Sequence, residues 1–418
     1  MFKYLLLILV PWLIISCKSS EEFTGFSYDP EGVTNTLDKT IYPQSRRIIG
    51  VDSPRVWVSN EFEGARINDF YMQNDSTFEV LIAPENAPIN NSPWYAFKIW
   101  SDTLRTANIQ FRYEDARHRY IPKISYKDST GWTQKSEGEV TFDTTTNAAN
   151  LTLELSKEPV LVSSHPLFTT SGFEESLEQR NIIGHDFVQK SKAGTSKLGR
   201  QIWELEISEV PENITAPVLV ILSRQHPPEV SGYLASLIFL EEITSGSQLA
   251  EEFRNTFVVK AFPIINPDGV DEGHWRHNAG GIDLNRDWDN FNQPETQAIR
   301  DALLPLKEDN SRQVFYGIDF HSTNENIFYP INEEVKTTPD NFTQKWTEIV
   351  MSDNPEVEFS VEEFDTSSPI SKNWLYKTFG ADAVTYEIND EIDEEILDEV
   401  SRSAARSLMQ LLLNEWNN

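Results

Sequence analysis

The chain has 418 residues, enough for two or three domains, and its 39% hydrophobic and 11% aromatic residues exclude an intrinsically disordered chain. Only 35 basic residues stand against 66 acidic ones, which gives a formal net charge of −31. A nucleic-acid partner is therefore not expected, because binding phosphates requires clustered Lys and Arg side chains.

The first residues predict an export signal. One Lys precedes an apolar run over residues 5–15, and polar residues follow Cys17. The run is short for a membrane span and typical of a cleaved signal peptide. The stretch Ile14-Ile-Ser-Cys17 resembles a bacterial lipobox, so residues 1–16 are predicted to be removed and Cys17 to carry a lipid. We therefore expect an exported, membrane-anchored bacterial lipoprotein, and a single cysteine excludes an internal disulfide.

Residues 17–160 are predicted to form an all-β, antiparallel sandwich domain. Short runs that alternate polar with apolar or β-branched residues recur here, separated by Asn, Asp, Gly and Pro. This pattern is typical of a sandwich. The clearest runs are 55–58, 77–82, 94–100, 108–113 and 139–142.

Residues 161–418 predict a second, α/β domain with a mixed, mostly parallel sheet covered by helices. Long apolar strands alternate here with helical patterns. The expected strands are 217–222, 257–262, 314–320 and 383–386, and the expected helices are 230–243 and 394–416.

Candidate metal ligands follow two of these strands. His226 and Glu229 lie three residues apart after the first strand, and His321 ends the strand 314–320. In open α/β sheets the site lies beyond the carboxyl ends of the strands, so these side chains are expected to converge. Two imidazoles and one carboxylate are a ligand set of hydrolytic zinc sites, which predicts one Zn²⁺ ion.

With these residues in place, the chain resembles the zinc carboxypeptidase superfamily. The resemblance extends over residues 194–387 and rests on seven motifs in order: Gly194-Thr-Ser-Lys-Leu-Gly-Arg200, His226-Pro-Pro-Glu229, Asn266-Pro-Asp-Gly269, Trp275-Arg276, Asp283-Leu-Asn-Arg286, Asp319-Phe-His-Ser322 and Thr385-Tyr-Glu387. The stretch Asn91-Ser-Pro-Trp-Tyr-Ala-Phe-Lys98, before the α/β region, is similar to the sandwich domain of cytosolic-type carboxypeptidases.

The resemblance implies roles for five further residues. Glu387 would act as general base, and Arg276 would stabilise the oxyanion of the tetrahedral intermediate. Asn285 and Arg286 would bind the terminal carboxylate of a peptide substrate. Asp268 is expected to orient a zinc-bound imidazole.

Substrate preference depends on less specific positions. Counting back from Glu387 places Lys372 at the position that sets side-chain preference in the family. A lysine there would favour substrates that end in Glu or Asp. The alternative is that Lys372 is a solvated surface lysine. The same register puts Asp365, beside Phe364, where many relatives have a substrate-binding Tyr, and Pro228 where digestive members have an additional Arg.

Three functions follow from this interpretation. The leading hypothesis is a zinc metallocarboxypeptidase that removes C-terminal residues from peptides. The second is an amidase or carboxypeptidase acting on cell-wall peptides, whose acidic ends Lys372 would also suit. The third is a non-catalytic binding lipoprotein, against which the joint presence of ligands, base and carboxylate-binding residues argues. The sequence leaves the oligomeric state open.

Overall fold

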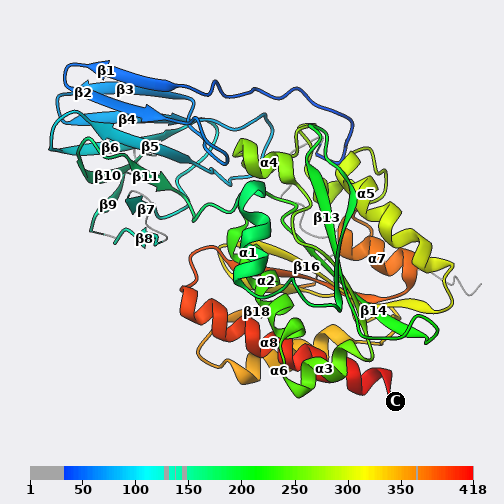
Figure 1. Ribbon diagram of the computed structural model, residues 1–418. Helices are drawn as coiled ribbons and strands as arrows, with labels where there is room; N and C mark the ends of the chain where they lie inside the picture. The colour runs from blue at the N-terminus through cyan, green and yellow to red at the C-terminus, as the bar shows by residue number, and fades with distance from the viewer. Residues whose placement is uncertain (1–32, 127–130, 137, 144–147, 364–365, 418) are drawn as a thin grey trace, which may run out of the picture.

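The computed structural model describes residues 33–126, 131–136, 138–143, 148–363 and 366–417, which form a sandwich domain beside a larger α/β domain (Figure 1). The predicted signal peptide, residues 1–16, and Cys17 lie outside these ranges. Within them, no helix is both long and apolar enough to cross a bilayer.

The N-terminal domain consists of two packed β-sheets. The first has the strand order β1–β2–β5–β11–β7–β8, formed by Ile48–Asp52, Arg55–Ser59, Ala96–Ser101, Val160–Ser163, Lys123–Tyr126 and Thr133–Gln134. The second has the order β3–β4–β6–β10–β9, formed by Asp69–Asn74, Thr77–Ile82, Arg105–Tyr113, Ala148–Leu155 and Val140–Asp143.

The two sheets pack together through the buried side chains that alternate with exposed ones along their strands. In β6, Ile109, Phe111 and Tyr113 point into the shared core while residues between them face outward, because successive side chains of a strand lie on opposite faces. The strand pairs are antiparallel except for β4 with β6, which run parallel and depart from the predicted antiparallel arrangement.

The α/β domain is built on one mixed sheet of eight strands. Its order is β12–β13–β15–β14–β16–β19–β17–β18, formed by Val188–Thr195, Gln201–Ile207, Val258–Phe262, Ala216–Ser223, Arg312–Thr323, Asp382–Asn389, Asn326–Tyr329 and Phe359–Val361. The four central strands, β15, β14, β16 and β19, are parallel to one another. They contain the four predicted strands, and the predicted mixed α/β fold is confirmed.

Helices cover both faces of this sheet (Figure 1). They are α1 (Phe173–Gln179), α2 (Val230–Thr244), α3 (Gln248–Arg254), α4 (Pro267–Glu272), α5 (Pro294–Leu303), α6 (Phe342–Asp353), α7 (Ser371–Phe379) and α8 (Glu394–Trp416), with single 3₁₀ turns at Thr170–Gly172, Leu284–Arg286 and Leu304–Lys307. Strand β14 is buried throughout because Leu219 and Ile221 join one core and Val218 and Val220 the other.

This topology brings chemically reactive residues to one edge. Strand β14 leads into the turn that holds His226 and Glu229, while β16 and β19 place His321 and Glu387 opposite each other in register. Because β14, β16 and β19 run in the same direction, their carboxyl ends open on the same side of the sheet.

Candidate active site

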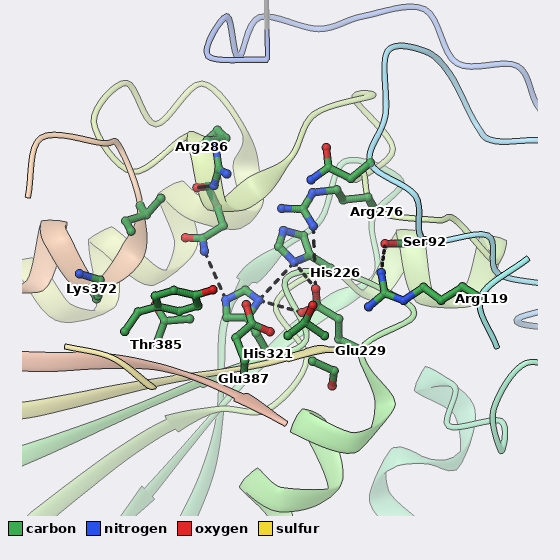
Figure 2. A pocket seen from close by; sticks show the side chains of 16 residues that line it. Ser92, Arg119, His226, Glu229, Arg276, Arg286, His321, Lys372, Thr385 and Glu387 are labelled. Carbon is green, nitrogen blue, oxygen red and sulfur yellow. Dashed lines mark hydrogen bonds and ion pairs between the residues drawn. The ribbon is translucent and has the colours of Figure 1, made fainter. Parts of the chain in front are cut away.

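Three buried side chains converge at the carboxyl edge of the sheet (Figure 2). His226 Nδ1 lies 2.7 Å from one carboxylate oxygen of Glu229, and His321 Nδ1 lies 2.7 Å from the other. The two Nδ1 atoms are 3.2 Å apart. The predicted ligands therefore come together, and they are the candidate metal cluster found among the described residues.

A carboxylate holds the outer nitrogen of each imidazole. His226 Nε2 lies 2.8 Å from Asp283 Oδ1, and His321 Nε2 lies 2.8 Å from Asp319 Oδ2. When each Nε2 donates to its carboxylate, the neutral ring presents an Nδ1 lone pair inward, which is the tautomer that a metal ligand requires. Two lone pairs and the Glu229 carboxylate then face one point, an arrangement that a cation satisfies. The donor set fits zinc.

The carboxylates that hold the two imidazoles are not the one that the sequence predicted. Asp268 was expected to orient an imidazole, but it accepts hydrogen bonds from Ser196 Oγ, the Leu198 N–H and the Arg200 guanidinium. That prediction is wrong because Asp268 lies in α4 and supports the β12–β13 turn. The sequence Asp319-Phe-His321 could have indicated Asp319 as the partner of His321, because residues two apart in a strand point to the same face.

The backbone around the ligands is closely packed. Helix α2 begins immediately after Glu229, and Gly232 in its first turn lies against the backbone of His321. A Cβ at Gly232 would come within 2.2 Å of the His321 carbonyl oxygen. The Gly232 N–H also donates to Ser322 Oγ at 2.8 Å. Glycine here lets the helix that follows one ligand approach the strand that carries another.

Glu387 lies on β19, next to the strand β16 that carries His321, and faces the candidate metal ligands. Its Oε2 is buried and accepts no hydrogen bond from the described residues. Burial raises the pKa of Glu387 to about 7, although the nearby His321 acts to lower it. A carboxyl group with a pKa near neutrality can both accept and return a proton.

Arg276 and Asp283 form a buried ion pair beside the ligands. Arg276 Nε donates to Asp283 Oδ2 at 2.6 Å, while the other oxygen of Asp283 accepts from His226 and from the Asn285 N–H. Burial acts to raise the pKa of Asp283, but the positive charges of Arg276 and Arg286 and the hydrogen bond from His226 hold it well below its usual range. Asp283, which the sequence analysis left without a role, therefore links Arg276 to a metal ligand.

The two residues expected to bind a terminal carboxylate also line the pocket. Arg286 is partly exposed and donates from Nη1 to its neighbour's carbonyl, while the Asn285 carboxamide oxygen accepts the Ser371 N–H at 3.0 Å. Asn285 thus joins the 3₁₀ turn to the start of α7. The pocket, of about 240 Å³, contains both residues together with His226, Glu229 and His321.

Lys372 lies inside this pocket and not on the surface. It is fully buried in α7, and its Nζ donates to the Pro330 carbonyl oxygen at 2.9 Å. The alternative of a solvated lysine is therefore wrong. The neighbouring positions Phe364 and Asp365 lie outside the described residues.

Several residues that line the pocket had no predicted role. Asn90, Ser92 and Arg119 come from the N-terminal domain, and Tyr329 comes from β17. Arg119 is held by Asp390 of the α/β domain at 2.5 Å. It also donates to Ser92 Oγ at 3.3 Å (Figure 2). No local pattern marks an arginine that reaches another domain.

The fold and the ligand cluster together define a class of α/β protein that can hold a metal ion at the carboxyl edge of a mixed sheet. The zinc carboxypeptidase family profile, Peptidase_M14, matches residues 174–399, more than half of the chain. The chain therefore belongs to the zinc carboxypeptidase family, and the superfamily resemblance is confirmed.

Curated relatives include human cytosolic carboxypeptidase 2, which is 34% identical over 157 residues, covering 35% of this chain and 17% of the relative. Mouse cytosolic carboxypeptidase 6 is 28% identical over 155 residues, covering 35% of this chain and 28% of the relative. The matches thus span well under a third of the length of these relatives.

Solved structures share the fold over both domains. A metallo-carboxypeptidase from Burkholderia cenocepacia aligns with a TM-score of 0.71 at 15% identity, covering 86% of this chain and 99% of the other. A metallo-carboxypeptidase from Pseudomonas aeruginosa, in complex with (2-guanidinoethylmercapto)succinic acid, aligns with a TM-score of 0.67 at 18% identity, covering 86% and 99%.

The contact between Gly232 and His321 predicts a metal-binding defect. We expect Gly232→Ala to displace His321 and lower zinc affinity roughly 10–100-fold, the usual range when the support of a metal ligand is disturbed. Competition with a zinc chelator measures this affinity. Gly246→Ala is the control, because its new methyl group would meet open space. Equal zinc affinity in the two variants would contradict the prediction.

Proposed function

We propose that this protein is a metallocarboxypeptidase that removes single residues from the C-terminal end of peptides. The observation that carries the proposal is one pocket that holds a three-ligand metal site, a carboxyl group with raised pKa, and guanidinium groups beside it. Each component alone occurs in other proteins. Their combination is suited to peptide hydrolysis at a chain end.

The protein residues divide the chemistry among them. Bound by His226, Glu229 and His321, a zinc ion would supply Lewis acidity and a water of lowered pKa. Glu387 would take the proton of the attacking water and return it to the leaving amine. Arg276 would donate hydrogen bonds to the oxygen on which negative charge develops.

The restriction to chain ends would come from Asn285 and Arg286. A guanidinium group matches a carboxylate with two parallel hydrogen bonds, so Arg286 suits the free carboxylate of a terminal residue. Substrates without that carboxylate would lose this contact. The pocket would then favour exopeptidase over endopeptidase cleavage.

We further propose a preference for acidic terminal residues. Lys372 carries a buried amine and lines the same pocket as Arg286 and Thr385. A buried cation gains more from a carboxylate partner than from an apolar side chain, because the interaction is weakly screened there. Terminal Glu or Asp would therefore bind best.

A peptide-library digest tests the activity. We expect zinc-loaded wild-type protein to shorten peptides by one residue at a time from the C-terminus, as read by mass spectrometry. Glu387→Gln should reduce kcat roughly 10²–10⁴-fold, the usual contribution of a general base, without loss of bound zinc.

Other outcomes of this digest would favour the alternatives. Cleavage restricted to purified muropeptides would indicate a cell-wall peptidase. No chelator-sensitive cleavage of any substrate would contradict the proposal and favour the binding protein.

Terminal preference is tested at Lys372. Lys372→Gln removes the charge and retains an N–H donor for the Pro330 carbonyl oxygen. We expect kcat/KM for Glu-ended peptides to fall roughly 10–100-fold, as a charge-assisted hydrogen bond of about 1.5–3 kcal/mol would give, while Leu-ended peptides change little. Lys377→Gln, an exposed lysine on the same helix, is the control. An unchanged ranking of peptides would refute the preference.

We also propose that the protein is exported and anchored through a lipid on Cys17. The apolar run and the sequence before Cys17 support this, while the residues themselves lie outside the described part of the chain. In a bacterial host, we expect the wild-type protein to enter the detergent phase in phase separation. Cys17→Ser should remain in the aqueous phase. A mature wild-type mass without added acyl groups would contradict lipidation.

A further inference from the structure

A buried carboxylate of the N-terminal domain holds the backbone of the loop that carries Arg276. Glu85, in the segment between β4 and β5, is 0% exposed. It accepts hydrogen bonds from the N–H groups of Trp275 at 2.8 Å, Arg276 at 3.1 Å and His277 at 2.8 Å. One side chain thus fixes three successive peptide units of the other domain.

The environment of Glu85 favours the ionised form of its side chain. Burial acts to raise its pKa, but the charges of His274, His277 and Arg66 and the N–H of Trp275 lower the pKa of Glu85 to about 2. Burial also lowers the pKa of both histidines, that of His277 to about 4, so near neutral pH the backbone N–H groups and the Arg66 charge are what favour the ionised form of Glu85.

Further contacts between the domains hold the same loop, residues 273–283. Asn86, next to Glu85, donates to the Gly281 carbonyl at 3.0 Å and contacts His277 Nδ1 at 2.6 Å. Trp275 Nε1 donates to the Trp94 carbonyl oxygen at 3.1 Å. The loop is therefore packed against the N-terminal domain along its length, and its shape depends on that domain.

Arg276 is held at both ends. Its backbone N–H is fixed by Glu85, and its guanidinium is fixed by Asp283, which also contacts the ligand His226. The guanidinium lies beside the metal ligands, with Nη1 3.9 Å from Glu229 Oε1 (Figure 2). A donor for a developing charge is effective only when it is already in place, because moving it during the reaction costs free energy.

We propose that Glu85 is a positioning residue for catalysis, which aligns Arg276 with the oxygen that becomes negatively charged. This inference rests on the proposed carboxypeptidase activity. It assigns the N-terminal domain a part in the chemistry, because a residue of the sandwich determines where an arginine of the α/β domain points. Glu85 itself has no contact with substrate and acts through Arg276.

The test begins with Glu85→Gln in the full-length, zinc-loaded protein. The amide retains one oxygen acceptor and places an NH₂ group against a backbone N–H, so the loop loses part of its anchor. We expect kcat to fall roughly 10–100-fold with KM within about threefold, because the lost interaction belongs to the transition state. Bound zinc should not change.

A double-mutant cycle with Arg276→Ala identifies the route of the effect. If Glu85 acts through Arg276, Glu85→Gln should lower kcat no further when Arg276 is already removed. Independent, multiplicative losses in the double variant would overturn the proposal.

Glu391→Gln provides a matched control. Glu391 also accepts a backbone N–H across the domain interface, from Ile121 at 2.9 Å, and pairs with Lys123, but its recorded partners lie outside loop 273–283. We expect it to lower Tm and leave kcat unchanged.

Two results would overturn the inference in different ways. If Glu85→Gln also lowers only Tm while wild type is active, Glu85 is structural and the proposed function stands. If wild type cleaves no peptide, the proposed function fails, and the role of Glu85 fails with it.

Discussion

The site depends on two buried imidazoles that are each held between two carboxylates. Asp283 and Asp319 lie 2.8 Å from the outer nitrogens of His226 and His321, and both Nδ1 atoms face the Glu229 carboxylate. A bound cation would accept electron pairs from both rings and from Glu229 at one buried point. The surrounding structure maintains this arrangement, since one aspartate shares a strand with its histidine and the other is held by Arg276.

The sheet supplies the rigidity that this arrangement requires. Parallel strands β14, β16 and β19 are buried on both faces, and they end at the same edge. Their register places His321 beside Glu387, so a metal ligand and the proposed base are neighbours across one strand pair. Residues on central strands hold their positions more precisely than residues on loops.

The N-terminal domain closes the other side of the site. Its Arg119, Ser92 and Asn90 line the pocket, and its Glu85 holds the loop that carries Arg276. An ion pair to Asp390 from Arg119, which lines the pocket, joins the two domains, and the pair from Lys123 to Glu391 joins them outside the pocket lining. Buried pairs of this kind fix geometry more reliably than they add stability. The sandwich therefore belongs to the active site as well as to the scaffold.

The amino-acid sequence by itself indicated the four central strands, the two longest helices, the α/β class and the three residues of the candidate metal site, because apolar periodicity and motif spacing are local properties. It also placed Glu387, Arg276 and the pair Asn285–Arg286, since each lies in a short motif next to a predicted strand. Only the tertiary structure decided that Asp283 and Asp319, and not Asp268, hold the imidazoles, and that Lys372 is buried. It alone placed Arg119 and Glu85 at the site, because contacts between residues about 190 positions apart, such as Glu85 with Trp275, leave no pattern along the chain.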